Sequence, residues 1–165
     1  ELDELEELFD DLDFDEPSEE HLNAIYQIFK DDFFFNKVSV DDKEVKVNSQ
    51  PRRRHPFRGK METFVHVITR ESKYRGKGHR EFERERANRI HWIKPILNQQ
   101  DAFAIKVFSK EHSNKQMQTF FWYEDKDFVV LLREIQPDFL LITAYCVDKQ
   151  NKGQFTRWYR EYKGL

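Results

Sequence analysis

The sequence has little of the chemistry that defines disulfide-rich, metal-binding or membrane-spanning proteins. Its single cysteine, Cys146, excludes a disulfide within the chain and favours a reducing compartment. One cysteine and six scattered histidines give no zinc-site spacing. No apolar run approaches the roughly 18 residues needed to span a bilayer, and no signal-peptide pattern is visible. We therefore expect a cytoplasmic protein with no membrane partner, no metal and no cofactor.

Several common enzyme motifs are also missing. Only 5 of the 165 residues are glycine, and no glycine-rich phosphate loop precedes a helix. Neither a G-x-S-x-G nor a Cys–His pattern of a nucleophilic enzyme is present. Aromatic residues, in contrast, are abundant: 16 Phe, 6 Tyr and 3 Trp can build a core although only 38% of the chain is hydrophobic. The length is that of one domain.

Charge is distributed very unevenly along the chain. Residues 1–20 contain 12 Asp and Glu and no Lys or Arg, whereas residues 51–94 contain 14 Lys and Arg against 5 Asp and Glu. Such a basic belt is typical of proteins that bind polyanions. We expect residues 1–17 to form a flexible acidic arm and residues 18–165 to form a single α+β domain.

Two roles remain open for the acidic arm. It is either a solvated tail or a segment that occupies the basic surface in cis. Leucines at helical spacing would allow it to dock on the body of the protein; they are Leu2, Leu5, Leu8 and Leu12.

Hydrophobic patterning predicts helices first and strands later. A helix is expected to begin at the N-cap Ser18, and a hairpin is expected to join Lys37–Val40 to Glu44–Val47. The β-branched segment Glu62–Thr69 is predicted to be a strand, and Ser72–Gly78 a basic linker. Further strands are predicted at Ala102–Phe108, Gln118–Tyr123, Phe128–Arg133 and Phe139–Val147. The fold class that follows is α+β, with N-terminal helical elements packed on an antiparallel four-stranded meander.

The segment His79–Leu97 is predicted to be a helix whose apolar stripe is interrupted by arginines. At about 100° per residue, Arg86 falls within the stripe and Arg89 near its edge. Because a guanidinium stays charged, these residues either line an anion site or form salt bridges with Glu83, Glu85 or a distant carboxylate. Pro95 is expected to kink or end the helix near Lys94, with a short further turn to Asn98.

Histidines and hydroxyl groups supply the other candidate site residues. His66 and His91 suit acid–base work because imidazole titrates near neutral pH. Thr143 and Tyr145 share one face of the last predicted strand, opposite a core face made by Leu140, Ile142, Ala144 and Cys146. RNA cleavage without a metal needs a base for the 2′-hydroxyl, charge stabilisation at phosphorus and an acid for the leaving oxygen; His, Arg and hydroxyl groups can provide these.

Three motifs in this order resemble phage-associated nucleases of the barnase–EndoU–colicin–RelE (BECR) superfamily. The motifs are F-x-H (Phe64 to His66), E-R-x-R-A-N-R-I-H-W-I (Glu83 to Ile93) and L-I-T-A-Y (Leu141 to Tyr145). The resemblance covers Lys37–Lys163 and implies a BECR-like α+β fold and a metal-independent RNase, many of which are toxins. It implies that His66 and His91 act as base and acid and that Thr143 and Tyr145 position the phosphate.

The resemblance also assigns further residues. Arg133 stands where a catalytic Lys is usual, and an arginine there can stabilise charge but cannot act as a base. Arg86 and Arg89 are expected to bind phosphate, both from their place in the predicted helix and from the resemblance. Lys94 and Trp122 are candidate substrate contacts in addition to those that the resemblance assigns. The expected function is a toxin-like endoribonuclease, associated with a phage or mobile element, that cleaves tRNA or mRNA by 2′-hydroxyl transesterification and has an antitoxin or immunity protein as a partner. The alternatives are a non-catalytic nucleic-acid-binding module and an interaction domain in which the arginines only form salt bridges.

Overall fold

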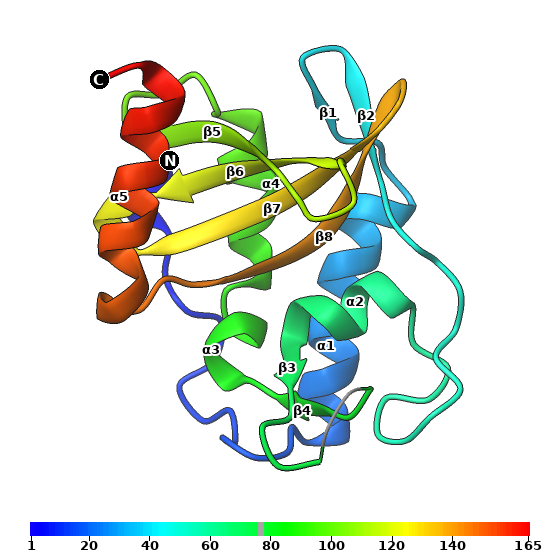
Figure 1. The fold of residues 1–165 in the computed structure, drawn as a ribbon. Helices are drawn as coiled ribbons and strands as arrows, with labels where there is room; N and C mark the ends of the chain where they lie inside the picture. The colour runs from blue at the N-terminus through cyan, green and yellow to red at the C-terminus, as the bar shows by residue number, and fades with distance from the viewer. Residues whose placement is uncertain (76–77) are drawn as a thin grey trace.

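The computed structural model describes residues 1–75 and 78–165 and has an α+β architecture built on a curled sheet (Figure 1). The strands are β1 (Ser39–Val40), β2 (Lys43–Lys46), β3 (Thr69–Glu71), β4 (Arg80–Phe82), β5 (Ile105–Glu111), β6 (Met117–Tyr123), β7 (Phe128–Ile135) and β8 (Asp138–Cys146). The α-helices are α1 (Glu19–Phe29), α2 (Glu62–Ile68), α3 (Arg84–Ala87), α4 (Ile93–Asn98) and α5 (Lys149–Lys163). Shorter helical turns are η1 (Leu2–Glu4), η2 (Lys30–Phe34, a π-helical turn), η3 (Ile90–Trp92) and η4 (Glu124–Lys126).

The main sheet has six strands in the order β1-β2-β8-β7-β6-β5. Strands β5 to β8 pair with their neighbours in antiparallel fashion, and β1 and β2 form the predicted hairpin. Strand β2 then pairs with β8 in parallel, through Val45 with Phe139 and Lys46 with Leu140. The sheet is therefore larger and mixed, whereas we expected four antiparallel strands. Buried Val45 explains the addition, since it joins the hairpin to the core.

Two apolar cores lie on the two faces of this sheet. The larger core joins α1, α2, η3 and α4 to one face. The smaller core lies between the other face and α5; its buried members are Phe108, Phe120, Trp122, Val129, Leu131, Val147 and Phe155. Both long helices begin at side-chain caps: Ser18 Oγ accepts from the His21 amide at 3.0 Å, as predicted, and Asp148 accepts from the Asn151 amide at 2.9 Å.

A bulge in β8 changes which of its residues face the larger core. Leu131 of β7 pairs with Thr143, but Leu132 pairs with Leu141, so Ile142 is an extra residue. One extra residue reverses the alternation of side chains along a strand. Phe139 and Leu141 are therefore buried in the larger core together with Ala144, and the predicted core face containing Leu140 and Ile142 is wrong for this half of the strand.

The segment Glu62–Thr69 is not a strand. Residues Glu62–Ile68 form α2, and only Thr69 enters β3. Strand propensity misled the prediction because it measures the fit of a side chain to a half-buried pleated surface. Here Phe64, Val65, Val67 and Ile68 are all at most 1% exposed, so packing around the whole helix overrides that propensity.

The predicted helix His79–Leu97 is also wrong in its first half. It begins as β4, which pairs with β3, and then forms α3, η3 and α4. The chain breaks at Arg89, whose backbone leaves the helical region (φ −117°, ψ 14°). Pro95 is instead tolerated in the first turn of α4, where a backbone N–H has no helical partner. The helix ends at Asn98, as predicted.

The acidic arm lies against the body of the protein. Leu2 and Leu12 are 7% and 3% exposed, and the amide of Leu8 donates to the carbonyl of Asn88 at 3.1 Å. Trp92 Nε1 donates to the carbonyl of Glu6 at 2.9 Å. The leucine spacing thus corresponds to a docked arm. Of the predicted basic linker, Gly76 and Lys77 lie outside the described residues.

Candidate functional site

A group of charged side chains, most of them basic, lies beside α2. We define His66, Glu62, Arg52, Arg80 and Arg86 as the His66 cluster. Helix α2 ends at Ile68, and the carbonyl of its C-cap residue, Thr69, accepts from Arg86 Nη1 at 2.7 Å and from Arg80 Nη2 at 2.9 Å. Carbonyls at a helix C-terminus attract cations because they carry partial negative charge. The end of the helix thereby holds two guanidinium groups beside the histidine.

His66 is half-exposed, with 43% of its side chain accessible, and its Nε2 lies 3.7 Å from Glu62 Oε2. Partial burial lowers the pKa of His66 below the ordinary value, and the charges of Arg80, Arg52 and Arg86 lower it further, against the opposing effect of Glu62. The imidazole is therefore neutral at neutral pH, which is the protonation state that a general base requires.

The end of β8 completes this region. Strand β2 covers β8 only at Phe139 and Leu140, and α2 and α3 lie along the rest of that edge (Figure 1). Thr143 Oγ1 donates to the carbonyl of His66 at 3.1 Å and lies 3.5 Å from Arg86 Nη1. The guanidinium of Arg86 lies 5.4 Å from the ring centre of Tyr145. His66, Arg86, Thr143 and Tyr145, four of the predicted site residues, therefore lie together.

Arg86 is largely enclosed by these partners. Its side chain is 15% exposed, and its Nε lies 2.9 Å from Glu83 Oε2. This ion pair is the salt-bridge alternative that the sequence offered for Arg86. Tyr145 packs towards Phe155 of α5, with ring centres 6.4 Å apart, and burial raises the pKa of its phenol. Arg86 and Tyr145 are therefore held by contacts with other side chains of the protein.

The structure separates His91 from His66. His91 and Lys94 line another cavity, of about 440 Å³, together with Ile28, Asp32 and Pro95. Partial burial lowers the pKa of His91 as well. The two histidines that the resemblance pairs as base and acid thus lie in different places, because the turn η3 directs His91 towards α1.

The remaining predicted residues do not join the cluster. Arg89 binds the acidic arm: its Nη2 lies 2.9 Å from Glu7 Oε1. Trp122 is 0% exposed in the smaller core, so the expectation that it contacts substrate is wrong. Arg133 lies in β7 opposite Leu140, two cross-strand pairs from Thr143.

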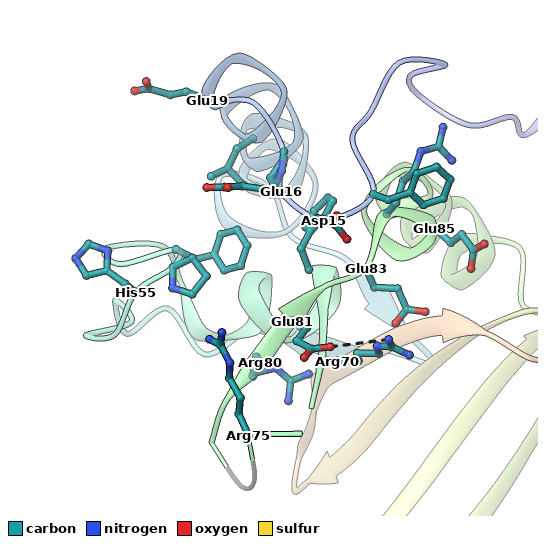
Figure 2. A pocket seen from close by; sticks show the side chains of 17 residues that line it. Asp15, Glu16, Glu19, His55, Arg70, Arg75, Arg80, Glu81, Glu83 and Glu85 are labelled. Carbon is teal, nitrogen blue, oxygen red and sulfur yellow. Dashed lines mark ion pairs between the residues drawn. The ribbon is translucent and has the colours of Figure 1, made fainter. Parts of the chain in front are cut away.

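A cleft of about 1060 Å³ opens beside the His66 cluster, between the end of the arm and the β3–β4 hairpin (Figure 2). Asp15, Glu16 and Glu19 line its arm side. The side made by the hairpin and the loop 51–60 is lined by Arg70, Arg75, Arg80, Glu81 and His55, and Glu81 Oε2 lies 3.9 Å from Arg70 Nη2. Arg80 belongs to both the cleft and the His66 cluster, so it connects the two.

Three arginines of this region were not singled out from the sequence: Arg52, Arg70 and Arg80. The available signal was their membership of the basic belt. Two parts of that belt, the loop 51–60 and the residues before β4, contact each other. Arg52 Nη2 donates to the carbonyl of Gly78 at 3.3 Å, and a Cβ at Gly78 would lie 3.3 Å from Arg54 Nη1. The loop 51–60 and the hairpin thereby form one basic surface.

Thiol and metal chemistry find no support among the described residues. Burial raises the pKa of the Cys146 thiol to about 11, so this thiol is not an activated nucleophile near neutral pH. Among the described residues, no group of three or more His, Cys, Asp and Glu side chains could hold a metal ion. No helix in residues 1–75 and 78–165 combines the length and apolar character needed to cross a membrane.

Comparisons with protein-family models, with curated proteins and with solved structures give no match to this chain.

Proposed function

We propose that this protein binds RNA at the His66 cluster and cleaves it without a metal, by attack of a 2′-hydroxyl on the adjacent phosphate. One observation carries the proposal: a histidine with a lowered pKa lies half-exposed among three guanidinium groups. Neutral imidazole is a base for the 2′-hydroxyl proton. Guanidinium groups bind phosphate and stabilise the charge that develops on it. Arg80 is the main candidate for this role because it donates to neutral oxygens of Thr69, whereas Arg52 and Arg86 pair with Glu62 and Glu83.

The separation of the two histidines shapes the mechanism. His66 takes the 2′-hydroxyl proton as the 2′-oxygen bonds to phosphorus and the bond from phosphorus to the 5′-oxygen breaks. The products are a 2′,3′-cyclic phosphate and a 5′-hydroxyl, which receives its proton from solvent at the half-exposed cluster. With one positioned proton-transfer group instead of two, we expect a slower enzyme, by about 100- to 10,000-fold, than one using an acid–base pair.

Charge and the family resemblance both support this proposal. Residues 51–80 contain ten Lys and Arg against two Glu, and much of this segment forms the basic surface beside the cleft. His66, Arg86, Thr143 and Tyr145 are residues to which the BECR resemblance gives a role. We further propose that α2 to α4 and β5 to β8 correspond to the helical elements and four-stranded sheet of that fold, and that the β1–β2 hairpin is an addition.

A defined RNA in excess EDTA tests the proposal. A single-stranded oligoribonucleotide should be cut to products that end in a 2′,3′-cyclic phosphate, and the matched all-deoxy oligonucleotide should remain intact because it lacks the nucleophile. Mass spectrometry identifies the product ends. Intact RNA after prolonged incubation with excess protein would reject the enzymatic function.

A second candidate function is a non-catalytic nucleic-acid-binding module of a phage or mobile element. The position of His91 outside the cluster favours it, since only one of the expected pair of proton-transfer groups lies at the site. This function predicts binding that weakens steeply with salt, without turnover. The EDTA experiment and a binding titration at two salt concentrations distinguish the two functions.

A further inference from the structure

Tyr74 is an unusual residue on the basic surface beside the cleft. It follows β3 at the tip of the β3–β4 hairpin, and its side chain is 90% exposed. Residues 70–80 contain five Lys and Arg against one Glu. An aromatic ring that is almost fully exposed, in a segment rich in cations, is typical of a surface on which nucleic-acid bases stack.

The backbone that carries Tyr74 is fixed by Ser72. The Ser72 side chain is buried, donates to Glu81 Oε1 at 2.7 Å, and accepts from the amides of Tyr74 at 3.3 Å and Arg75 at 3.1 Å. The amide of Ser72 also donates to the carbonyl of His79 at 2.8 Å, which extends the hairpin. The ring is thus presented to solvent by a hydrogen-bonded turn.

We propose that Tyr74 is a stacking platform for a base of single-stranded RNA whose phosphates lie along Arg75 and Arg80 towards His66. The inference rests on the proposed RNA binding and deepens it by naming the class of substrate. Figure 2 places Arg75 and Arg80 on the same side of the cleft, across from Asp15 and Glu16. Tyr74 lies five residue steps after Thr69, so at about 3.3 Å per step its Cα lies at most roughly 17 Å from that of Thr69, the C-cap of α2.

Stacking selects single strands over duplexes. In a duplex each base already stacks on its neighbours and its faces are covered, whereas an unpaired base can be splayed onto an aromatic ring. Phosphate contacts alone do not make this distinction, because both forms of RNA carry the same backbone charge. Loss of the ring should therefore affect the two forms differently.

The test measures fluorescence anisotropy with a labelled 2′-fluoro oligonucleotide, which lacks the nucleophile, as a single strand and as a duplex of the same length. We expect Tyr74→Ala to weaken binding of the single strand by about 5- to 100-fold and to leave the duplex within about twofold. Tyr74→Phe should retain wild-type affinity because the ring remains. Phe103→Ala is the matched control, since Phe103 is a fully exposed aromatic in the turn before β5.

The stacking platform, the enzymatic function and RNA binding itself would each be rejected by a different result. Wild-type affinity of Tyr74→Ala for the single strand, or an equal loss for both forms of RNA, overturns the stacking platform while leaving RNA binding intact. Tight, Tyr74-dependent binding of single strands together with no cleavage of natural RNA overturns the enzymatic function and supports the platform. Absence of RNA binding by the wild-type protein overturns both.

Discussion

Arg84 and Arg89 differ from Arg80 in the partners that their guanidinium groups contact. On α3 and the turn after it, Arg84 and Arg89 both face the acidic arm, and Glu7 lies 3.5 Å from Arg84 Nη1 and 2.9 Å from Arg89 Nη2. Beside α2, Arg80 instead donates to two neutral oxygens of Thr69, at 2.7 and 2.9 Å. A guanidinium paired with a carboxylate is neutralised, whereas one held by neutral acceptors keeps its attraction for an anion. The partner, more than the arginine, decides where a phosphate can bind.

The largest expected effect separates the two histidines. His66→Ala should lower the rate of RNA cleavage by about 100- to 10,000-fold, because it removes the proposed base. His91→Ala should leave the rate within about threefold, since His91 lies in the cavity with Asp32 and Lys94. Initial rates on a fluorogenic RNA measure both, and thermal melting shows that each variant is folded. Equal losses in the two variants would contradict the assignment of His66 alone.

Arg80 and Arg84 test the comparison directly. We expect Arg80→Gln to weaken RNA binding by about 10-fold, because it removes a charge with neutral partners, and Arg80→Lys to recover part of that loss. Arg84→Gln should change RNA affinity little and lower the melting temperature, since Arg84 holds the arm through Glu7 and the carbonyl of Leu12. Titrations with RNA and melting curves of the three variants measure these effects. A reversed pattern would place the RNA on α3.

The pH dependence should also separate the histidines. Both have a lowered pKa, so the unfolded chain takes up protons first as the pH falls below about 6.5, and the free energy of unfolding decreases there. His66→Gln and His91→Gln should each reduce this decrease, as measured by urea unfolding across the same pH range. In cleavage assays with wild-type protein and His91→Gln, activity should fall on the acidic side as His66 becomes protonated. If His91→Gln no longer lost activity at acidic pH, the group whose protonation lowers activity would be His91 and not His66.

The sequence predicted the elements whose patterns are local. Ser18 caps α1, the β1–β2 hairpin forms, and β5 to β8 arise from β-rich runs separated by polar turns. Segments near the candidate site were harder to predict. Glu62–Ile68 carries strand-favouring residues but is surrounded by packing partners, and Asn88, which is 0% exposed, ends α3 with a side chain bonded to Glu7 and Phe9, 79 or more residues away.

The same distinction applies to the candidate site residues. The convergence of His66, Arg86, Thr143 and Tyr145 follows motifs that the sequence displays. Arg80 was missed because its position depends on a two-stranded pairing with β3 inside a segment predicted to be a linker and a helix. Trp122 was misplaced because an aromatic residue in a strand has the same local signature on a binding face and in a core. Tertiary pairing, which local patterns do not encode, decided both.

The smallest expected effect concerns the arm. Glu7→Gln removes the carboxylate that lies between Arg84 and Arg89 and should expose their charge to RNA. We expect RNA affinity to rise by about two- to fivefold at low salt and to return to the wild-type value at high salt, because the added attraction is electrostatic and screened. Glu20→Gln makes the same change of charge at an exposed position of α1 and is the control. If both variants gain affinity equally, the gain reflects net charge alone; a gain confined to Glu7→Gln shows that the docked arm competes with RNA for the arginines of α3.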